Sequence, residues 1–191
     1  MAFMVLLFLP HGLLAQDSAA KPEAVSLLSA RQNLVGQWAG KLEYLDYQDN
    51  KWFGIPVDIN IEMIEDQTTL IRKAIFDDGP KKKVYITSIS MLDQDGETEY
   101  TSGFRADRPA YLSTSKLTFA VGSVKDIDHW AIVSLSEGMD DDRPAKIRET
   151  MTRDGNELTS LKEVDFTDDD KQEWFQRNRT ILSKKSSDRM P

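Results

Sequence analysis

The chain has 191 residues, of which 40% are hydrophobic and 29% are charged, a composition that fits one folded domain with a well-solvated surface. Its 24 Lys and Arg against 32 Asp and Glu give a net charge of -8, and an acidic surface repels nucleic-acid phosphates and anionic lipid headgroups. The sequence contains no cysteine, which excludes disulfides, thiolate metal sites, cysteine nucleophiles and iron–sulfur clusters. We therefore expect no nucleic-acid partner and a fold stabilised by packing alone.

The N-terminal segment 1–15, MAFMVLLFLPHGLLA, is apolar and carries no charged side chain. It is shorter than the ~20 apolar residues that a membrane-spanning helix needs, and polar residues follow it at once. No Lys or Arg precedes the run, and Leu13 is bulky for its place before a cleavage point after Ala15. The segment nevertheless predicts a signal peptide, and hence an exported protein, periplasmic or secreted, with no permanent membrane anchor.

The next segment, 16–33, predicts a short helix that leads into the folded domain. Val25 and Leu28 share one face at helical spacing, and Pro22 suits a first helical turn. From residue 34 to residue 184 the chain consists of β-rich runs separated by turn residues at short intervals. This pattern is typical of a single antiparallel barrel or sandwich domain.

Nine runs rich in β-branched and aromatic residues predict strands, at 34–47, 52–64, 68–76, 82–92, 98–105, 111–121, 129–137, 145–152 and 157–166. Several are separated by residues that favour tight hairpins, among them Asp95-Gly96 and Asp154-Gly155. Residues 57–63 alternate between apolar and polar side chains, which indicates a strand with one buried face.

The C-terminal end predicts a helix, a strand and a tail. Thr167 and the three Asp residues after it resemble a helix start, because a hydroxyl caps free amides and carboxylates favour the positive end of the helix dipole, so we expect a short helix at 168–176. Residues 177–184 predict a final strand, and 185–191 a disordered tail. The expected fold is all-β, an antiparallel up-and-down barrel of about nine or ten strands with a short N-terminal helix and a short C-terminal helix before the last strand.

The first predicted strand opens with Gly36-Gln37-Trp38 just after a short helix, and the last carries Arg177 and Arg179. This combination resembles the calycin superfamily, which includes the lipocalins and the fatty-acid-binding proteins. The resemblance implies that Trp38 closes one end of the barrel and that Arg179, or else Arg177, packs across its ring and fastens the last strand to the first. The string LVGQWAGKLEYLDY is also similar to the opening of bacterial exported proteins of unknown function.

Two features depart from the lipocalins proper. The basic residue expected on the tryptophan ring comes after the predicted C-terminal helix rather than before it. The chain also lacks the cysteines of the lipocalin disulfides. These departures concern membership of the lipocalins and not the barrel.

Once the predicted signal peptide is removed, His129 is the single histidine. One interpretation is a catalytic or heme-ligating residue whose ring Asp126 or Asp128 orients. The simpler interpretation is a residue at a junction between loop and strand, because a heme pocket leaves no distinctive local spacing. We therefore expect no cofactor.

Other chemistries find little support in the sequence. The stretches 101–103 and 122–123 contain Ser beside Gly but lack the glycine pattern of a serine-hydrolase nucleophile turn. The acidic runs 93–97, 140–142 and 168–170 offer oxygen atoms that suit Ca²⁺, yet a hairpin turn, a solvated loop and a helix cap explain them without a metal. We name no catalytic residue and no metal ligand.

Aromatic side chains with polar tips are spread over many predicted strands and are suited to line a cavity. They are Tyr44, Tyr47, Trp52, Tyr85, Tyr100, Tyr111 and Trp130. Arg148 and Glu149 are adjacent in a predicted strand, so one of them faces the interior, where an Arg pairs with a carboxylate or binds the anionic group of a ligand. Solvent exposure of Arg148 is the simpler case. We nevertheless select Tyr44, Tyr85, Trp130 and Arg148 as the expected ligand-binding residues.

These observations favour an exported barrel that binds a small hydrophobic or amphipathic molecule by burial and one or two polar contacts. Two alternatives remain open. One is an enzyme that uses the same cavity for isomerisation or hydrolysis, and the other is a ligand-free envelope interaction module with a packed barrel. The choice between them depends on whether the interior is hollow.

Overall fold

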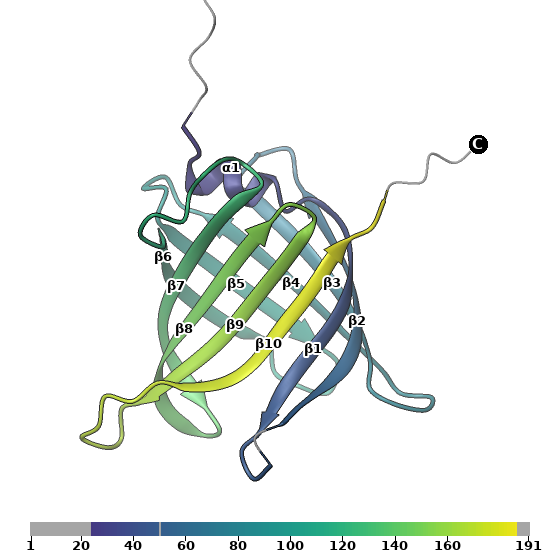
Figure 1. Cartoon of the computed structure of the whole chain (residues 1–191), viewed down its shortest axis with the longest axis vertical. Helices are drawn as coiled ribbons and strands as arrows, with labels where there is room; N and C mark the ends of the chain where they lie inside the picture. Colours follow the sequence, from purple (N-terminus) through teal and green to yellow (C-terminus); the bar gives the residue numbers. More distant parts are fainter. Residues whose placement is uncertain (1–23, 50, 187–191) are drawn as a thin grey trace, which may run out of the picture.

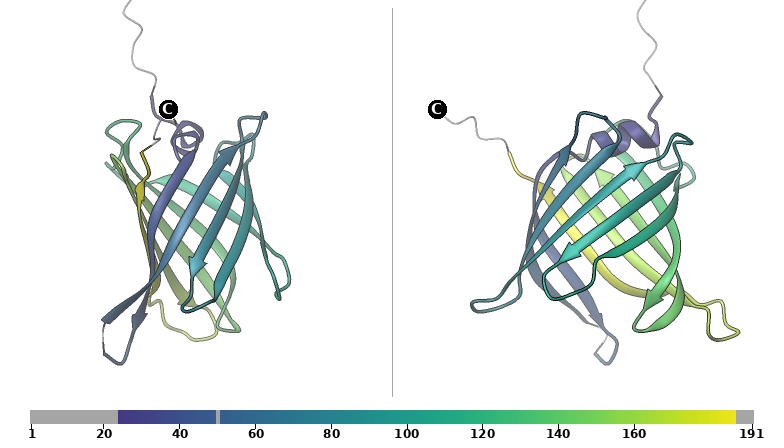
Figure 2. Two further views of the ribbon diagram at one scale, coloured as in Figure 1. Left: turned by 90° about the vertical axis from the view of Figure 1, so that its right-hand side faces the viewer. Right: turned by 180° about the vertical axis from the view of Figure 1, so that it is seen from behind.

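The computed structural model describes residues 24–49 and 51–186, in which ten antiparallel strands close into one barrel with a short helix at one end (Figures 1 and 2). This architecture confirms the predicted all-β barrel. The predicted signal peptide lies outside the described residues, as does the predicted tail from residue 187 onward. Within the two described ranges no helix is long and apolar enough to span a lipid bilayer.

The elements follow one another with short connections. They are α1 (Leu27–Gln32), β1 (Gly36–Asp46), β2 (Lys51–Met63), β3 (Thr69–Asp77), β4 (Lys83–Leu92), β5 (Thr98–Arg105), β6 (Tyr111–Phe119), β7 (His129–Asp140), β8 (Arg143–Asp154), β9 (Glu157–Phe166) and β10 (Phe175–Lys184). Each strand pairs with the next, and β1 also pairs with β10, so the order around the barrel is the order along the chain. Closure leaves no whole strand at a free edge, which protects a sheet from edge-to-edge aggregation.

The local sequence signals account for most of these elements. The residues from 57 to 61 alternate in β2 as predicted, with the odd-numbered ones buried. Gly96 and Gly155 lie in the turns after β4 and β8 with φ of +71° and +59°, the left-handed conformation that tight hairpins require. The strand pairs confirm the antiparallel order that these turn residues predict, as in β4–β5 and β8–β9.

The predicted helix at 168–176 is wrong, because this segment is an irregular connection and β10 begins within it. The carboxylates expected to cap a helix have other partners. Asp168 forms an ion pair with Arg143, and Asp169 accepts a hydrogen bond from the backbone N–H of Lys171 at 2.9 Å. Such side-chain bonds offer the backbone an alternative to the helical turn.

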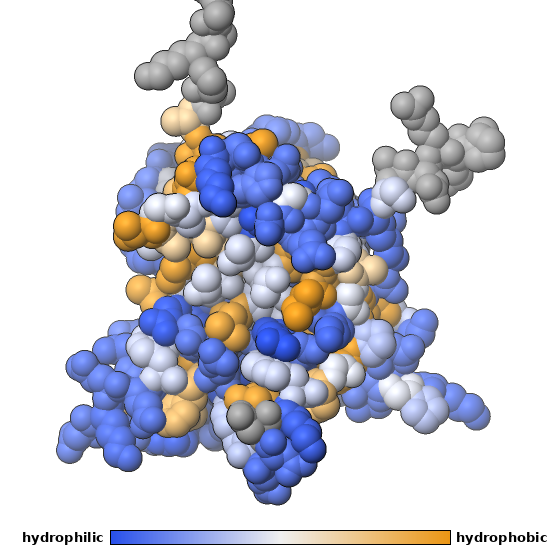
Figure 3. All heavy atoms as spheres, viewed as in Figure 1, coloured by the Kyte–Doolittle hydropathy of each residue, from blue (hydrophilic) through white to orange (hydrophobic). Residues whose placement is uncertain are grey.

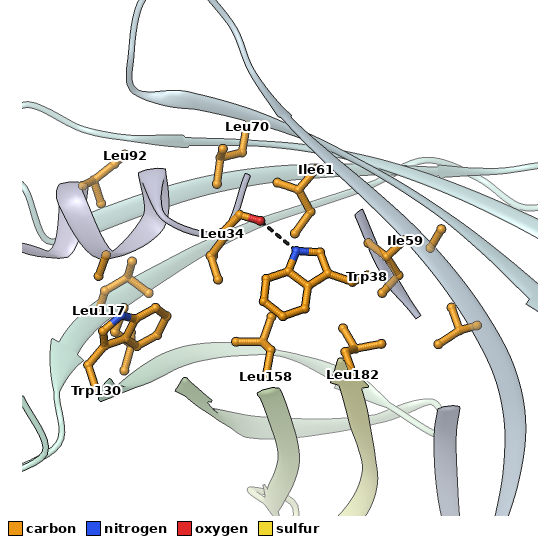
Figure 4. Close-up of a cluster of buried hydrophobic side chains, with 14 residues drawn as sticks. Leu34, Trp38, Ile59, Ile61, Leu70, Leu92, Leu117, Trp130, Leu158 and Leu182 are labelled. Atoms are coloured by element: carbon orange, nitrogen blue, oxygen red, sulfur yellow. Dashed lines mark hydrogen bonds between the residues drawn. The ribbon is translucent and has the colours of Figure 1, made fainter. Parts of the chain in front are cut away.

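A hydrophobic core fills the end of the barrel next to α1 (Figure 4). Trp38 has no exposed surface there, and its indole N–H donates to the carbonyl of Leu34 at 2.9 Å. Leu158 and Leu182, from β9 and β10, pack near the indole in Figure 4. Each fully buried side chain of this size stabilises the fold by about 1.5–3 kcal/mol. Trp38 thus plugs this end of the barrel, as predicted, and Gly36 starts its strand with φ of +132°, a conformation that strains other residues.

The predicted partner of Trp38 is wrong. Alternation along β10 turns Arg179 outward, and its guanidinium lies 4.3 Å from the ring centroid of Trp52. Arg177, the alternative, forms an ion pair near the opposite end of the barrel. Two cations lie over Trp38 instead. Lys184 of β10 has its Nζ 5.5 Å from the ring centroid, and Arg153 of β8 is closer, at 4.5 Å, and only 3% exposed. Burial lowers the pKa of Arg153, so this contact is a desolvated cation–π pair inside the wall.

Helix α1 covers the same end and is anchored by Arg31. Ser26 caps the helix, and its backbone N–H donates to the hydroxyl of Ser29 at 2.9 Å, which completes a capping box. Arg31 is 3% exposed, donates to the carbonyl of Thr68 at 3.0 Å and forms an ion pair with Glu99 at 2.8 Å. The helix and the packed core together close this end of the barrel.

Candidate functional site

A cavity of about 310 Å³ adjoins the core inside the barrel, lined by side chains from β2 through β10. Leu70, Leu158 and Leu182 form its apolar part next to the core, whereas the rest of the lining is rich in hydroxyl and charged groups. Its volume is at the lower end of the range of small-molecule sites. At ~30 Å³ for a water-sized group, about ten such groups fill it. The interior is therefore hollow and amphipathic.

Arg72 of β3 points into this cavity. Within the described residues its guanidinium has no hydrogen bond and no ion pair, while the adjacent Lys73 points outward and pairs with Glu62 at 3.0 Å. Arg72 is half-buried, because the surface that it exposes faces the cavity, and burial by the wall lowers the pKa of the guanidinium. A cation without a partner in such a space is unfavourable, so the site favours an anion.

Two further polar side chains act on Arg72 within the cavity, which the Arg31–Glu99 ion pair also lines. Glu149 comes from β8, on the opposite side of the wall from β3, and accepts a hydrogen bond from the hydroxyl of Ser160. Its negative charge acts to raise the pKa of Arg72 and so opposes the larger effect of burial. Tyr111 of β6 is the other, and burial raises the pKa of its phenol. A guanidinium, a carboxylate and a phenol therefore share one small space.

Tyr111 occupies its place because Gly103 of β5 has no side chain. The two residues are partners in the strand register, and a Cβ on Gly103 would lie 1.9 Å from the ring of Tyr111. Ser88 of β4 pairs in turn with Gly103, and Arg72 pairs with Ser88. These four residues form one row across β3 to β6, so strand register places the phenol and the guanidinium at the same level of the cavity.

The structure corrects the expected lining at Tyr85 and Arg148, which both point outward. Tyr85 is 61% exposed. Arg148 pairs with Glu163 at 2.8 Å, and its guanidinium lies 4.2 Å from the ring centroid of Trp174. Alternation along β8 turns the neighbouring Glu149 inward instead. Of these two adjacent residues, the one that faces the cavity is therefore the glutamate.

The other two expected ligand-binding residues, Trp130 and Tyr44, do not line the cavity either. Trp130 is 1% exposed within the core, where its indole N–H donates to the carbonyl of Ile127 at 2.8 Å. Tyr44 lies toward the opposite end of the barrel and stacks on Phe53, with the ring centroids 5.5 Å apart. Both residues therefore have packing partners of their own.

His129 lies where β7 begins and does not line the cavity. Its Nδ1 is 2.7 Å from a carboxylate oxygen of Asp126, and its Nε2 is 3.5 Å from Asp154. The bond to His129 lowers the pKa of Asp126, and the backbone N–H of His129 donates to the Asp126 carbonyl at 3.3 Å. The geometry thus matches a residue at a junction between loop and strand.

The acidic clusters form local turns and ion pairs. Asp95 accepts hydrogen bonds from Thr98 and from the backbone of Glu97, which hold the pKa of its carboxyl well below the ordinary value. Asp140 pairs with Lys162 at 2.6 Å. Among the described residues no group of acidic and histidine side chains is arranged to hold a metal ion.

Arg72 was not among the residues predicted to line a cavity, and Tyr111 was predicted only as one of several aromatic residues. A signal was present, because Arg72 shares its strand face with Leu70, which is buried. For Arg148 and Glu149, alternation alone leaves two equal choices. The closure of the barrel settles which face is inside.

No protein-family model and no curated protein matches this sequence. Among solved structures, the crystal structure of Rv2717c from M. tuberculosis is similar over 85% of this chain and 99% of that one, with a TM-score of 0.56 and 12% sequence identity. A protein of unknown function of the DUF3598 family from Nostoc punctiforme is matched over 85% of this chain and 100% of that chain, at a TM-score of 0.26 and 7% identity. The likeness to Rv2717c concerns the fold alone, a barrel that spans most of both chains.

Proposed function

We propose that this protein binds a small amphipathic molecule inside its barrel, with the anionic group of the ligand against Arg72. The observation that supports this proposal is a guanidinium without a partner among the described residues, in an interior cavity of about 310 Å³. In this proposal the protein is a calycin-like carrier that the apolar segment 1–15 directs to export. Arg72 takes the role that the sequence suggested for Arg148, which is to bind the anionic group of the ligand.

The lining supports an amphipathic ligand better than a purely hydrophobic one. The apolar part of the cavity next to the core suits a short hydrocarbon segment, and the row from Arg72 to Tyr111 suits a polar group. Glu149 already accepts a bond from Ser160, whereas Arg72 has no such partner within the described chain. An anionic oxygen of the ligand would therefore supply the hydrogen-bond acceptor that the Arg72 guanidinium lacks.

Octanoate tests the proposal, because its ten heavy atoms match the volume at ~30 Å³ each. We expect isothermal titration calorimetry to show binding of octanoate and much weaker binding of octylamine, whose charge Arg72 repels. Arg72→Gln removes one charge-assisted contact of about 1.5–3 kcal/mol, so it should weaken octanoate binding about 10- to 100-fold.

Lys73→Gln is the matched control, since it removes the same charge from the next residue on the outer face, and we expect it to leave octanoate binding unchanged. Circular dichroism and thermal melting of both variants verify their folding. Equal affinity for octanoate and octylamine, or an unchanged affinity in Arg72→Gln, would contradict the proposal. A barrel that binds neither compound would favour a ligand-free interaction module.

A further inference from the structure

The barrel wall is unpaired over part of the boundary between β6 and β7. These strands pair only where residues 116–119 meet residues 132–135, near the α1 end. Before that stretch, β6 from Tyr111 to Ser115 pairs only with β5, and after it, β7 from Ser136 to Asp140 pairs only with β8. In the right-hand view of Figure 2 the two strands separate toward the end away from α1. The sheet therefore has a slot at this boundary.

An apolar cleft of about 1130 Å³ lies on the outer surface over this slot. It is lined from the β6 side by Leu112 and from the β7 side by Leu135, which are 85% and 46% exposed. Tyr100 and Trp174 extend the lining across β5 and the connection before β10. An apolar surface of this extent rarely remains bare without a function. By contrast, the face shown in Figure 3 has only scattered hydrophobic residues among hydrophilic ones.

The cleft and the interior cavity adjoin each other at the slot. Thr101 lines both spaces. Tyr111 lines the cavity, and Leu112, the next residue, lines the cleft. One strand thickness thus separates the apolar outer surface from the row that carries Arg72.

The interior alone is too small for a long amphiphile. At ~30 Å³ for each group it holds about ten heavy atoms, and the packed core and α1 close the end beside it. The outer cleft, at about 1130 Å³ against about 310 Å³ for the cavity, offers more than three times that volume. A hydrocarbon chain anchored at Arg72 therefore outgrows the cavity, and the slot beside it leads to an apolar surface of sufficient volume.

We propose that the ligand is a long-chain amphiphile whose anionic head binds Arg72 inside the barrel and whose apolar tail passes between β6 and β7 into the outer cleft. The inference rests on the proposed function. It assigns Leu112 and Leu135 as the seat of the tail and makes chain length, rather than head group alone, the basis of selectivity.

A chain-length series of carboxylates tests this inference: octanoate, decanoate, dodecanoate and tetradecanoate, each below its critical micelle concentration. Full burial of one methylene corresponds to about fourfold in Kd, and half burial to about twofold. We expect the affinity of the wild-type protein to rise by at least about fourfold with each two added carbons. In Leu112→Ser/Leu135→Ser the affinity should stay near that of octanoate along the whole series.

The control is Val121→Ser, which removes a fully exposed apolar side chain outside the cleft and should keep the full gain with chain length. Octanoate should bind all three proteins equally, since its length matches the cavity. Failure of octanoate to bind at all would defeat the proposed function itself. Binding of octanoate without a gain for longer chains, or a gain that survives in the double serine variant, would defeat the tail seat and leave the cleft as a surface for a protein partner.

The absence of cysteine from the chain allows a second test. Ser115→Cys/Ser136→Cys places thiols on the two sides of the slot, and a cleavable bis-maleimide joins them. We expect the linked protein to lose the gain for tetradecanoate and to recover it after cleavage, whereas the same link in Thr118→Cys/Val133→Cys, where the strands already pair, should have no effect. Unchanged tetradecanoate binding in the linked slot variant would show that the tail follows another path.

Discussion

At the scale of single residues, two glycines leave room for different neighbours. A Cβ on Gly40 would lie 1.9 Å from the backbone oxygen of Ile181, across the β1–β10 pair. A Cβ on Gly103 would meet the far end of the Tyr111 side chain at the same 1.9 Å. A backbone atom cannot move without breaking the pairing, whereas a phenol can rotate. The same substitution should therefore have very different costs at the two sites.

We expect Gly40→Ala to destabilise the protein by about 3 kcal/mol or more and Gly103→Ala by about 1 kcal/mol, as urea unfolding followed by tryptophan fluorescence will measure. Gly103→Ala/Tyr111→Ala should recover most of the smaller loss, because the clashing ring is gone. No side-chain change at position 181 should rescue Gly40→Ala. Equal losses at both glycines would contradict the steric argument.

At the scale of elements, the seam between β1 and β10 is fastened on the outer surface by Glu43. The carboxylate is 5% exposed and lies 2.5 Å from Nζ of Lys41 and 2.5 Å from Nε of Arg179, its partner across the strands. Trp52 covers the Arg179 guanidinium. Lys41 first, and then Arg179, lower the pKa of Glu43, while burial opposes them. The arginine predicted to close the barrel thus does join the two strands, through a carboxylate rather than through Trp38.

This pair makes part of the stability dependent on pH. The folded state binds the Glu43 proton more weakly than the unfolded state, whose carboxyl has the ordinary pKa of 4.5. The contribution is therefore complete above pH 4.5 and is lost as the pH falls through the lower pKa of the folded state. We expect Glu43→Gln to reduce the free energy of unfolding by about 1–3 kcal/mol at pH 7 and by much less under acid conditions.

Urea unfolding of the wild type and of Glu43→Gln, at neutral pH and at successive points below pH 4.5, measures this difference. Glu62→Gln serves as the control, since the Glu62–Lys73 pair is exposed and contributes less than about 1 kcal/mol. A difference between wild type and Glu43→Gln that stays constant through the acid range would contradict the assignment.

At the scale of the whole molecule, stability depends on closure. Strand β10 pairs with β1 from Asn178 to Lys184 and with β9 along nearly its whole length, so its removal exposes two edges at once. We expect a chain that ends at residue 174 to lose the single cooperative unfolding transition and to aggregate, because unpaired edges are templates for other chains. Calorimetry and size-exclusion chromatography measure both effects. A truncated chain that stays monomeric and melts cooperatively would show that the barrel does not require its seam.

The sequence by itself determined the elements of this protein. Alternation between apolar and polar residues, as at 57–63, and turn residues such as Gly96 are local signals, and they located the strands and their antiparallel order. The burial of Trp38 was also predicted, from the resemblance of Gly36-Gln37-Trp38 to the calycin opening. The helix predicted at 168–176 was wrong because Asp168 pairs with Arg143, which lies in another hairpin.

The tertiary structure alone decided which side chains meet inside. Whether Arg148 or Glu149 faces the cavity, and whether Arg153 or Arg179 covers Trp38, depends on the face of each strand that closure turns inward. A shift of one residue in register reverses every such assignment, and no local pattern records it. The candidate site is built from residues that are neighbours only around the barrel, so it could not be predicted from their order along the chain.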